Sequence, residues 1–227
     1  CQALAKRRSN NEPMAYITGE KEFWSLPFIV SRQVLIPRPD SETLINAVIR
    51  HLSDYEKPQQ ILDIGTGTGC LLASLLTEWP SANGVGIDIS TGAVSLAQKN
   101  LEILGLQRRS KILVAEWPFY QPSEKFDVVI SNPPYVPTDD IQHLDPDVRE
   151  YEPIMALDGG SDGLALHREL ANHVKKVLKL GGLIAVEFGF EQSDDIQLIY
   201  SRAGFSRFQI QADLNGIERC LLATLEN

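Results

Sequence analysis

Hydrophobic and polar residues follow two alternating periods along most of this chain, and the pattern predicts strands and helices in turn. Short apolar runs typical of buried strands occupy 61–64, 83–89, 111–115, 126–130 and 183–188. Apolar residues at helical spacing occupy 70–79, 91–104, 163–180 and 194–202. This alternation predicts an α/β fold with a mostly parallel, doubly wound sheet that carries helices on both faces.

The two ends of the chain carry a different pattern. Near the C-terminus, 207–213 and 218–224 read as strands of a closing hairpin joined at Asn215-Gly216. Near the N-terminus, the aromatic stretch 22–30 predicts a short β-hairpin. We therefore expect an N-terminal linker and hairpin over 1–36, and a main domain over 37–227.

The main domain is expected to open with a helix near Asp40. Asp40 or Ser41 is a suitable cap, and the residues that form its apolar stripe are Leu44, Ile45, Val48, Ile49 and Leu52. Between 132 and 161 no period holds, so we expect an irregular stretch there.

Composition narrows the class of protein. The net charge of −9 argues against a binder of naked nucleic acid, and no apolar run approaches the ~20 residues of a membrane span. Three scattered cysteines (Cys1, Cys70 and Cys220) favour neither a disulfide framework nor a zinc site and fit a reducing cytoplasm. The histidines lack metal-ligand spacing, and we interpret all four as structural or surface residues: His51, His143, His167 and His173. The start has no signal peptide and no initiator Met, which suggests that a longer chain precedes it.

A glycine-rich segment joins the first predicted strand of the main domain to its helix. It reads DIGTGTG over 63–69, and the residues expected to line a cofactor are Gly65, Thr66, Gly67, Thr68 and Gly69. Cys70 stands where the dinucleotide fingerprint needs glycine, and the lysine of a Walker loop is absent. The segment therefore favours a nucleoside-like ligand without phosphates.

Two later strand ends complete the predicted cofactor site. Asp88 follows Gly69 by nineteen residues, near the offset at which a carboxylate meets ribose hydroxyls. Trp117 follows the third strand and could stack on an adenine face, while Glu116 could accept from the adenine amine. A glycine-rich turn with a capping aspartate, or a packed tryptophan, would be the structural alternatives.

The sequence Ser131-Asn132-Pro133-Pro134-Tyr135 follows the fourth strand and carries the predicted chemistry. A planar amide nitrogen is a poor nucleophile, and two acceptors, Asn132 Oδ1 and the Pro133 carbonyl, could fix its N–H bonds and aim its lone pair at a sulfonium methyl. Consecutive prolines stiffen such a loop, and Tyr135 supplies an aromatic wall. A proline-rich turn without catalytic role is the alternative.

These motifs together resemble the class I, Rossmann-like methyltransferases and, more narrowly, the peptide chain release factor glutamine N5-methyltransferases (the HemK/PrmC family). NPPY alone is shared with DNA adenine N6-methyltransferases. What narrows the resemblance is IPRPD followed by SET at 36–43, together with YEP at 151–153 and ALDGG at 156–160. EPMAYITG at 12–19, Glu22-Phe23, Val34-Leu35 and Asp162-Gly163 support it. The chain departs from the family pattern in two places, with Asp40-Ser41 in place of Glu-Thr and Glu116 in place of Asp.

The resemblance implies a seven-stranded sheet with an antiparallel last strand, and an N-terminal helical domain of which only 1–8 is visible here. It implies S-adenosylmethionine as cofactor, with S-adenosylhomocysteine as product, and methyl transfer to the glutamine of the Gly-Gly-Gln motif in class 1 release factors. It places Gly65–Gly69, Asp88 and Trp117 around the cofactor, and Asn132, Pro133, Pro134 and Tyr135 around the substrate glutamine. We expect a cytoplasmic monomer that needs no metal, membrane or nucleic acid.

Other functions share parts of this pattern. A glutamine methyltransferase acting on a ribosomal protein would use the same pocket, and a nucleic-acid adenine N6-methyltransferase would use NPPY on an extruded base. A non-catalytic cofactor-binding module is a third class. Arg38, Glu152 and Glu187 lie in segments that resemble the family, and the sequence leaves open whether they contact substrate or brace the pocket.

Overall fold

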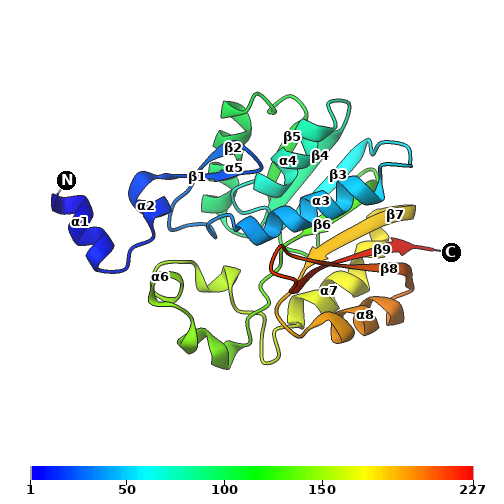
Figure 1. Ribbon diagram of the computed structural model, residues 1–227. Coiled ribbons are helices and arrows are strands. Elements are labelled where there is room, and N and C mark those ends of the chain that lie inside the picture. The colour runs from blue at the N-terminus through cyan, green and yellow to red at the C-terminus, as the bar shows by residue number, and fades with distance from the viewer. Residues whose placement is uncertain (1, 227) are drawn as a thin grey trace.

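A seven-stranded sheet forms the centre of the protein in a computed structural model, which describes residues 2–226 (Figure 1). Its strand order is β5-β4-β3-β6-β7-β9-β8. The strands are β3 (Gln60–Ile64), β4 (Asn83–Asp88), β5 (Ser110–Val114), β6 (Phe126–Ser131), β7 (Leu178–Glu187), β8 (Phe205–Ala212) and β9 (Glu218–Leu225). Within this sheet β9 runs opposite in direction to the other strands, which confirms the predicted α/β sheet with its antiparallel last strand.

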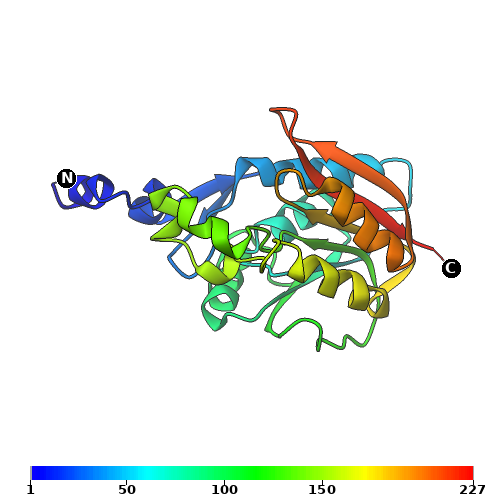
Figure 2. The same cartoon turned by 90° about the horizontal axis from the view of Figure 1, so that it is seen from below.

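Helices cover both faces of this sheet because its strands are apolar on both sides (Figure 2). One face packs α3 (Glu42–His51), α4 (Cys70–Glu78) and α5 (Thr91–Ile103) against strand residues such as Ile61 and Val128. The other face packs α7 (Ala165–His173) and α8 (Ser193–Arg202) against residues such as Leu62 and Val129. Two separate apolar cores therefore sandwich the sheet.

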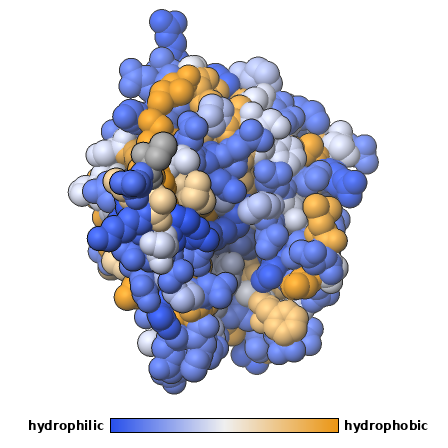
Figure 3. Space-filling model, turned by 60° about the vertical axis from the view of Figure 1, so that its left-hand side comes forward, coloured by the Kyte–Doolittle hydropathy of each residue, from blue (hydrophilic) through white to orange (hydrophobic). Residues whose placement is uncertain are grey.

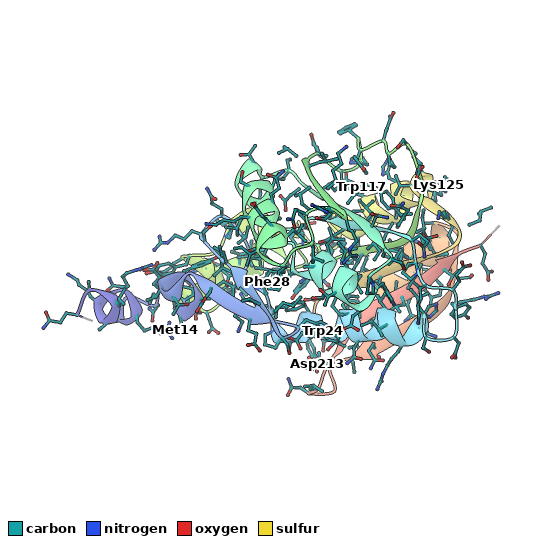
Figure 4. The ribbon with its side chains drawn as sticks, turned by 90° about the horizontal axis from the view of Figure 1, so that it is seen from above. Met14, Trp24, Phe28, Trp117, Lys125 and Asp213 are labelled. Atoms are coloured by element: carbon teal, nitrogen blue, oxygen red, sulfur yellow. The ribbon has the colours of Figure 1, made fainter. Side chains whose placement is uncertain are left out.

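The N-terminal part contains the predicted hairpin and two short helices. The helices are α1 (Gln2–Ser9) and α2 (Met14–Thr18), and the hairpin pairs β1 (Glu20–Phe23) with β2 (Leu26–Ile29). The hairpin joins the main core through buried Phe23 and Phe28, and Asn100 of α5 bonds both backbone groups of Ile29. Figure 4 shows Phe28 where the hairpin meets the body and Met14 farther out on the N-terminal arm. The predicted remnant includes Cys1, which lies outside the described residues.

Two predicted elements are wrong in detail. The helix expected over 163–180 ends at His173, continues as a 3-10 turn (η4, Val174–Lys176) and gives way to β7, whose Leu178 pairs with Phe126. Apolar residues at 174, 177 and 178 suit helix and strand equally, so their spacing did not mark the boundary. The expected cap is also absent: a 3-10 turn (η1, Pro39–Ser41) leads into α3, and Ser41 makes no capping bond.

The stretch 132–161 is irregular as expected, with η2 (Thr138–His143), α6 (Pro146–Arg149) and η3 (Ile154–Ala156) as its short helical turns. His167 of α7 is fully buried against Tyr200, and neither ring nitrogen has a hydrogen-bond partner among residues 2–226. Within that same range no helix is both long and apolar enough to cross a membrane.

Candidate active site

The candidate site lies where the carboxyl ends of β4, β3, β6 and β7 meet at one edge of the sheet. Parallel register aligns Ile64 with Ile87 on one side and with Ser131 on the other, and Ser131 with Val186. The loops that follow these strands are therefore neighbours, although they are far apart in the sequence. Figure 3 turns this edge toward the viewer and shows a hollow in a mainly hydrophilic surface. Ligands bind at such an edge in open α/β folds.

The glycine loop presents backbone, not side chains, to this edge. Gly65 and Gly67 have φ values of 71° and 53°, in the left-handed region that favours glycine. Gly65 is exposed and Gly67 half-buried, and no side chain lies within 4 Å of a Cβ built at either position. A ligand can therefore lie directly on this part of the chain.

Thr66 and Thr68 point the other way. Both are buried, and Thr66 Oγ1 donates to Asp63 Oδ2 at 2.6 Å. The Thr68 carbonyl accepts from Asn100 Nδ2 at 2.9 Å. Burial raises the pKa of Asp63 to about 7, against the lowering effect of the Thr66 hydrogen bond. The side chains of the two threonines thus shape the loop from within, and the cofactor contacts predicted for Gly65–Gly69, including Thr66 and Thr68, stay predictions.

Asp88 ends β4 beside the loop and is held by two backbone amides. Its Oδ2 accepts from Gly67 N and its Oδ1 from Ser90 N, both at 2.9 Å. The side chain is only half-buried, so each oxygen keeps a lone pair for a further donor. Next to it Ile89 is 53% exposed, an apolar surface that the sequence did not single out.

Trp117 lies in the apolar core beside β3 and β4. It is 8% exposed and belongs to the same cluster as Leu62, Ile64 and Ile87. Its indole nitrogen is buried without a hydrogen-bond partner among residues 2–226. Figure 4 labels it for orientation. Trp117 is therefore surrounded as a packed tryptophan would be, and its contact with adenine stays a prediction.

The NPPY turn is fixed to its neighbours at several points. Ser131 Oγ donates to the Ile64 carbonyl at 2.7 Å, which joins the start of the turn to the start of the glycine loop. Asn132 is half-buried and donates from Nδ2 to Ser41 Oγ at 3.1 Å. Pro133 is buried, whereas Pro134 is half-buried. The structure therefore places this predicted substrate turn directly beside the predicted cofactor loop.

Tyr135 is held by both its hydroxyl and its carbonyl. The hydroxyl donates to Glu187 Oε1 at 3.2 Å, and the carbonyl accepts from Gln192 Nε2 at 3.0 Å. Gly163 lies so close that an added Cβ would strike the same carbonyl. Burial, followed by the charge of Glu187, raises the pKa of the Tyr135 phenol. The ring is therefore a neutral, fixed wall.

Glu187 ends β7 behind the turn and is 1% exposed. Burial raises its pKa to about 7, against the lowering effects of the Ser41 and Tyr135 hydroxyls and of Arg219. Ser41 was predicted only as a possible helix cap. Glu187 was one of the residues, with Arg38 and Glu152, for which the sequence left open whether they contact substrate or brace the pocket.

Arg38 and Glu152 form an ion pair at the rim. Arg38 donates from Nη2 to Glu152 Oε1 at 2.5 Å, and Glu152 Oε2 accepts from Ile36 N at 3.2 Å. Burial raises the pKa of Glu152, while Arg38 opposes that rise. The pair joins the segment before α3 to the irregular stretch after the NPPY turn.

Comparison with known proteins gives consistent relatives. Residues 39–144 match the family described as methyltransferase small domain. The chain is 41% identical over 217 residues to the release factor glutamine methyltransferase of Caulobacter vibrioides, covering 96% of this chain and 75% of the relative. It is 43% identical over 222 residues to the enzyme of the same name from Rhodospirillum rubrum, covering 98% and 67%.

A solved structure agrees with these relatives. The protein-(glutamine-N5) methyltransferase (release factor-specific) from Alicyclobacillus acidocaldarius is 26% identical, with a TM-score of 0.51. The match covers 88% of this chain and 100% of the solved chain.

Proposed function

This chain belongs to the release factor glutamine methyltransferases, and from that premise we propose that it methylates the glutamine side chain in the Gly-Gly-Gln motif of class 1 release factors. The methyl donor in this proposal is S-adenosylmethionine. The observation that carries it is the NPPY turn, Asn132–Tyr135, fixed beside a side-chain-free glycine loop.

The cofactor half of the site has the chemistry that a nucleoside requires. Gly65 and Gly67 leave room for the methionine and ribose end, and the two Asp88 oxygens keep lone pairs for ribose hydroxyls. Exposed Ile89 offers an apolar surface for the adenine, and Trp117 belongs to the buried cluster that also contains Ile87. When bound, S-adenosylmethionine supplies an electrophilic methyl group on a positively charged sulfur.

The substrate half prepares an unreactive nitrogen. Because Asn132 Nδ2 is bound to Ser41, Oδ1 is the end of the amide left to accept an N–H from the glutamine. The Pro133 carbonyl accepts the second N–H in this proposal. Two fixed acceptors hold the nitrogen with its lone pair toward the methyl group, and the turn needs no rearrangement at the moment of reaction. Tyr135 covers the flat amide on one side.

Residues 37–227 form the methyltransferase domain in this proposal, with 1–36 as its N-terminal cover and linker. Its site of action is the cytoplasm, where release factors work, and it acts as a monomer without nucleic acid. Arg38 and Glu152 join the segment before α3 to the 132–161 stretch. This contact supports a role for the pair in bracing the rim of the site.

The direct test uses purified protein, S-adenosylmethionine with a labelled methyl group and a recombinant class 1 release factor. Mass spectrometry of the peptide that contains Gly-Gly-Gln should show one added methyl group on the glutamine. A release factor with that glutamine changed to alanine is the matched control and should stay unlabelled. Label in a ribosomal protein or in duplex DNA, with none in the release factor, would replace this proposal with one of the alternatives.

A further inference from the structure

Ser41 connects the catalytic turn to a buried carboxylate that lies behind it. The serine is 3% exposed and sits at the end of η1, where its hydroxyl is free because it does not cap α3. On one side it accepts from Asn132 Nδ2 at 3.1 Å. On the other side it faces the Glu187 carboxyl, whose pKa it lowers. Three residues from different parts of the sequence therefore meet behind the pocket.

The hydrogen bonds among these residues all point toward the Glu187 carboxyl. Tyr135 already donates to Glu187 Oε1 at 3.2 Å, and Glu187 Oε2 has no hydrogen-bond partner by distance and angle among residues 2–226. Above a pH of about 7 the Glu187 carboxylate is ionised and only accepts, so in that form it attracts the single Ser41 proton to its side. The lone pairs of Ser41 Oγ then face Asn132 and accept its NH₂ end.

This direction matters because the two ends of an asparagine amide have nearly the same shape but opposite hydrogen-bonding character. If the amide turned over, its NH₂ would face the NH₂ of the substrate glutamine, and one of the two acceptors would be lost. A buried donor or acceptor without its partner is costly, so a fixed neighbour can select one orientation.

We propose that Ser41 and Glu187 are positioning residues, which hold the Asn132 amide with Nδ2 inward and Oδ1 toward the substrate. This inference rests on the proposed function, since it concerns how the same turn receives an NH₂ group. Glu187 acts on Asn132 indirectly, through Ser41. It acts on Tyr135 directly, by accepting a hydrogen bond from the Tyr135 hydroxyl.

The test compares Ser41→Ala with Ser41→Thr. Alanine removes the acceptor, and we expect kcat to fall roughly 10-fold or more, as for loss of one oriented contact in a transition state. Threonine keeps the hydroxyl and should retain most of the activity. The affinity for S-adenosylmethionine, measured by calorimetry, should stay within about twofold of wild type in both variants, because Ser41 does not touch the glycine loop. Wild-type kcat in Ser41→Ala would overturn the proposal.

A double-mutant cycle separates positioning from general damage. If Ser41 acts only through Asn132, adding Ser41→Ala to Asn132→Ala should lower kcat no further. If the double mutant instead loses kcat by the product of the two single-mutant factors, the proposal is overturned. Glu187→Gln is nearly the same size as the native residue but has an NH₂ group that can donate to Ser41, so it should also lower kcat while leaving cofactor affinity intact. Unchanged kcat in Glu187→Gln would limit the positioning role to Ser41 and overturn the pairwise proposal.

The wild-type protein distinguishes this inference from the proposed function. If wild type methylates no release factor but does label another NH₂ acceptor, the proposed substrate is wrong and the same cycle is measured on that acceptor. If wild type methylates the release factor and the cycle is multiplicative, the proposed function stands and the positioning role of Ser41 is rejected.

Discussion

Asp88 Oδ2 accepts the backbone amide of Gly67 at 2.9 Å, so the predicted ribose ligand also fixes the loop on which the ribose would lie. Asp88→Ala removes both functions. We expect the affinity for S-adenosylmethionine to fall roughly 10- to 100-fold, the range for one or two hydrogen bonds to a charged group. Asp88→Asn keeps one acceptor oxygen and should lose less. Calorimetry measures both, and an unaltered affinity in Asp88→Ala would reject the ribose role.

Asn132→Ala should separate turnover from cofactor binding. The variant loses the oriented acceptor that receives the glutamine N–H, so kcat should fall roughly 10²-fold, while the affinity for S-adenosylmethionine stays nearly the same. Single-turnover methylation and calorimetry give the two numbers. Equal losses in both would mean that Asn132 is structural.

The pH dependence of turnover should report Glu187. Burial raises the pKa of Glu187 to about 7, and only the ionised form keeps the Ser41 proton directed inward. Therefore kcat should rise as the pH increases through about 7. The charged and titratable groups that face this carboxyl are Asp40, Cys70, Tyr135, Arg219 and Cys220.

A matched variant identifies the group that titrates. Asp63 has a pKa raised to about 7 as well, so the wild-type profile alone does not separate the two carboxyls. In Glu187→Gln the residual activity should lose its dependence on pH near 7. A profile that keeps its inflection in this variant would assign it to Asp63.

Gly163→Ala should damage the substrate turn from behind. The glycine has a φ of 74°, and a Cβ there would strike the Tyr135 carbonyl. Gly105→Ala is the control, because Gly105 has a similar φ of 72° but nothing within 4 Å of an added Cβ. Both variants should lose about 1 kcal/mol of stability from backbone strain. Only Gly163→Ala should also lose kcat at a temperature where both are folded.

His167 should make the fold sensitive to acid. Burial lowers the pKa of His167 to about 3, whereas in the unfolded chain the imidazole binds a proton near its ordinary pKa of 6.5. Between these values only the unfolded state is protonated, so the contribution of His167 to stability falls by about 1.4 kcal/mol per pH unit as the pH decreases from 6.5 toward 3. This slope is opposite in sign to the contributions of Asp63 and Glu187, whose pKa values are raised to about 7, and it is measured as the difference between wild type and the variant. His167→Gln should remove this slope in urea unfolding at pH 5 to 7. His143→Gln, at an exposed position, should leave it unchanged.

Local sequence predicted the central strands because they are short apolar runs, some of which lead directly into glycine, as β3 leads into Gly65. It did not predict where α7 ends, since Val174, Val177 and Leu178 fit the core in either conformation. The glycine loop and the NPPY turn were recognised because their chemistry lies within a few consecutive residues. The sequence left the role of Glu187 open and marked Ser41 only as a cap, because these residues join Tyr135 and Asn132 only through the folded sheet, over separations of 52 and 91 residues.

Strand β9 completes the surroundings of the Glu187 carboxyl late in folding. Glu187 pairs with Cys220, and Phe188 N donates to the Arg219 carbonyl, so the dry surroundings of that carboxyl depend on the final strand. During synthesis, residues 218–225 leave the ribosome after every other part of the sheet. Until they insert between β7 and β8, water reaches the carboxylate and the turn lacks its rigid backing. Synthesis through β9 is therefore required for methyltransferase activity, and a nascent chain that stops before β9 should be inactive.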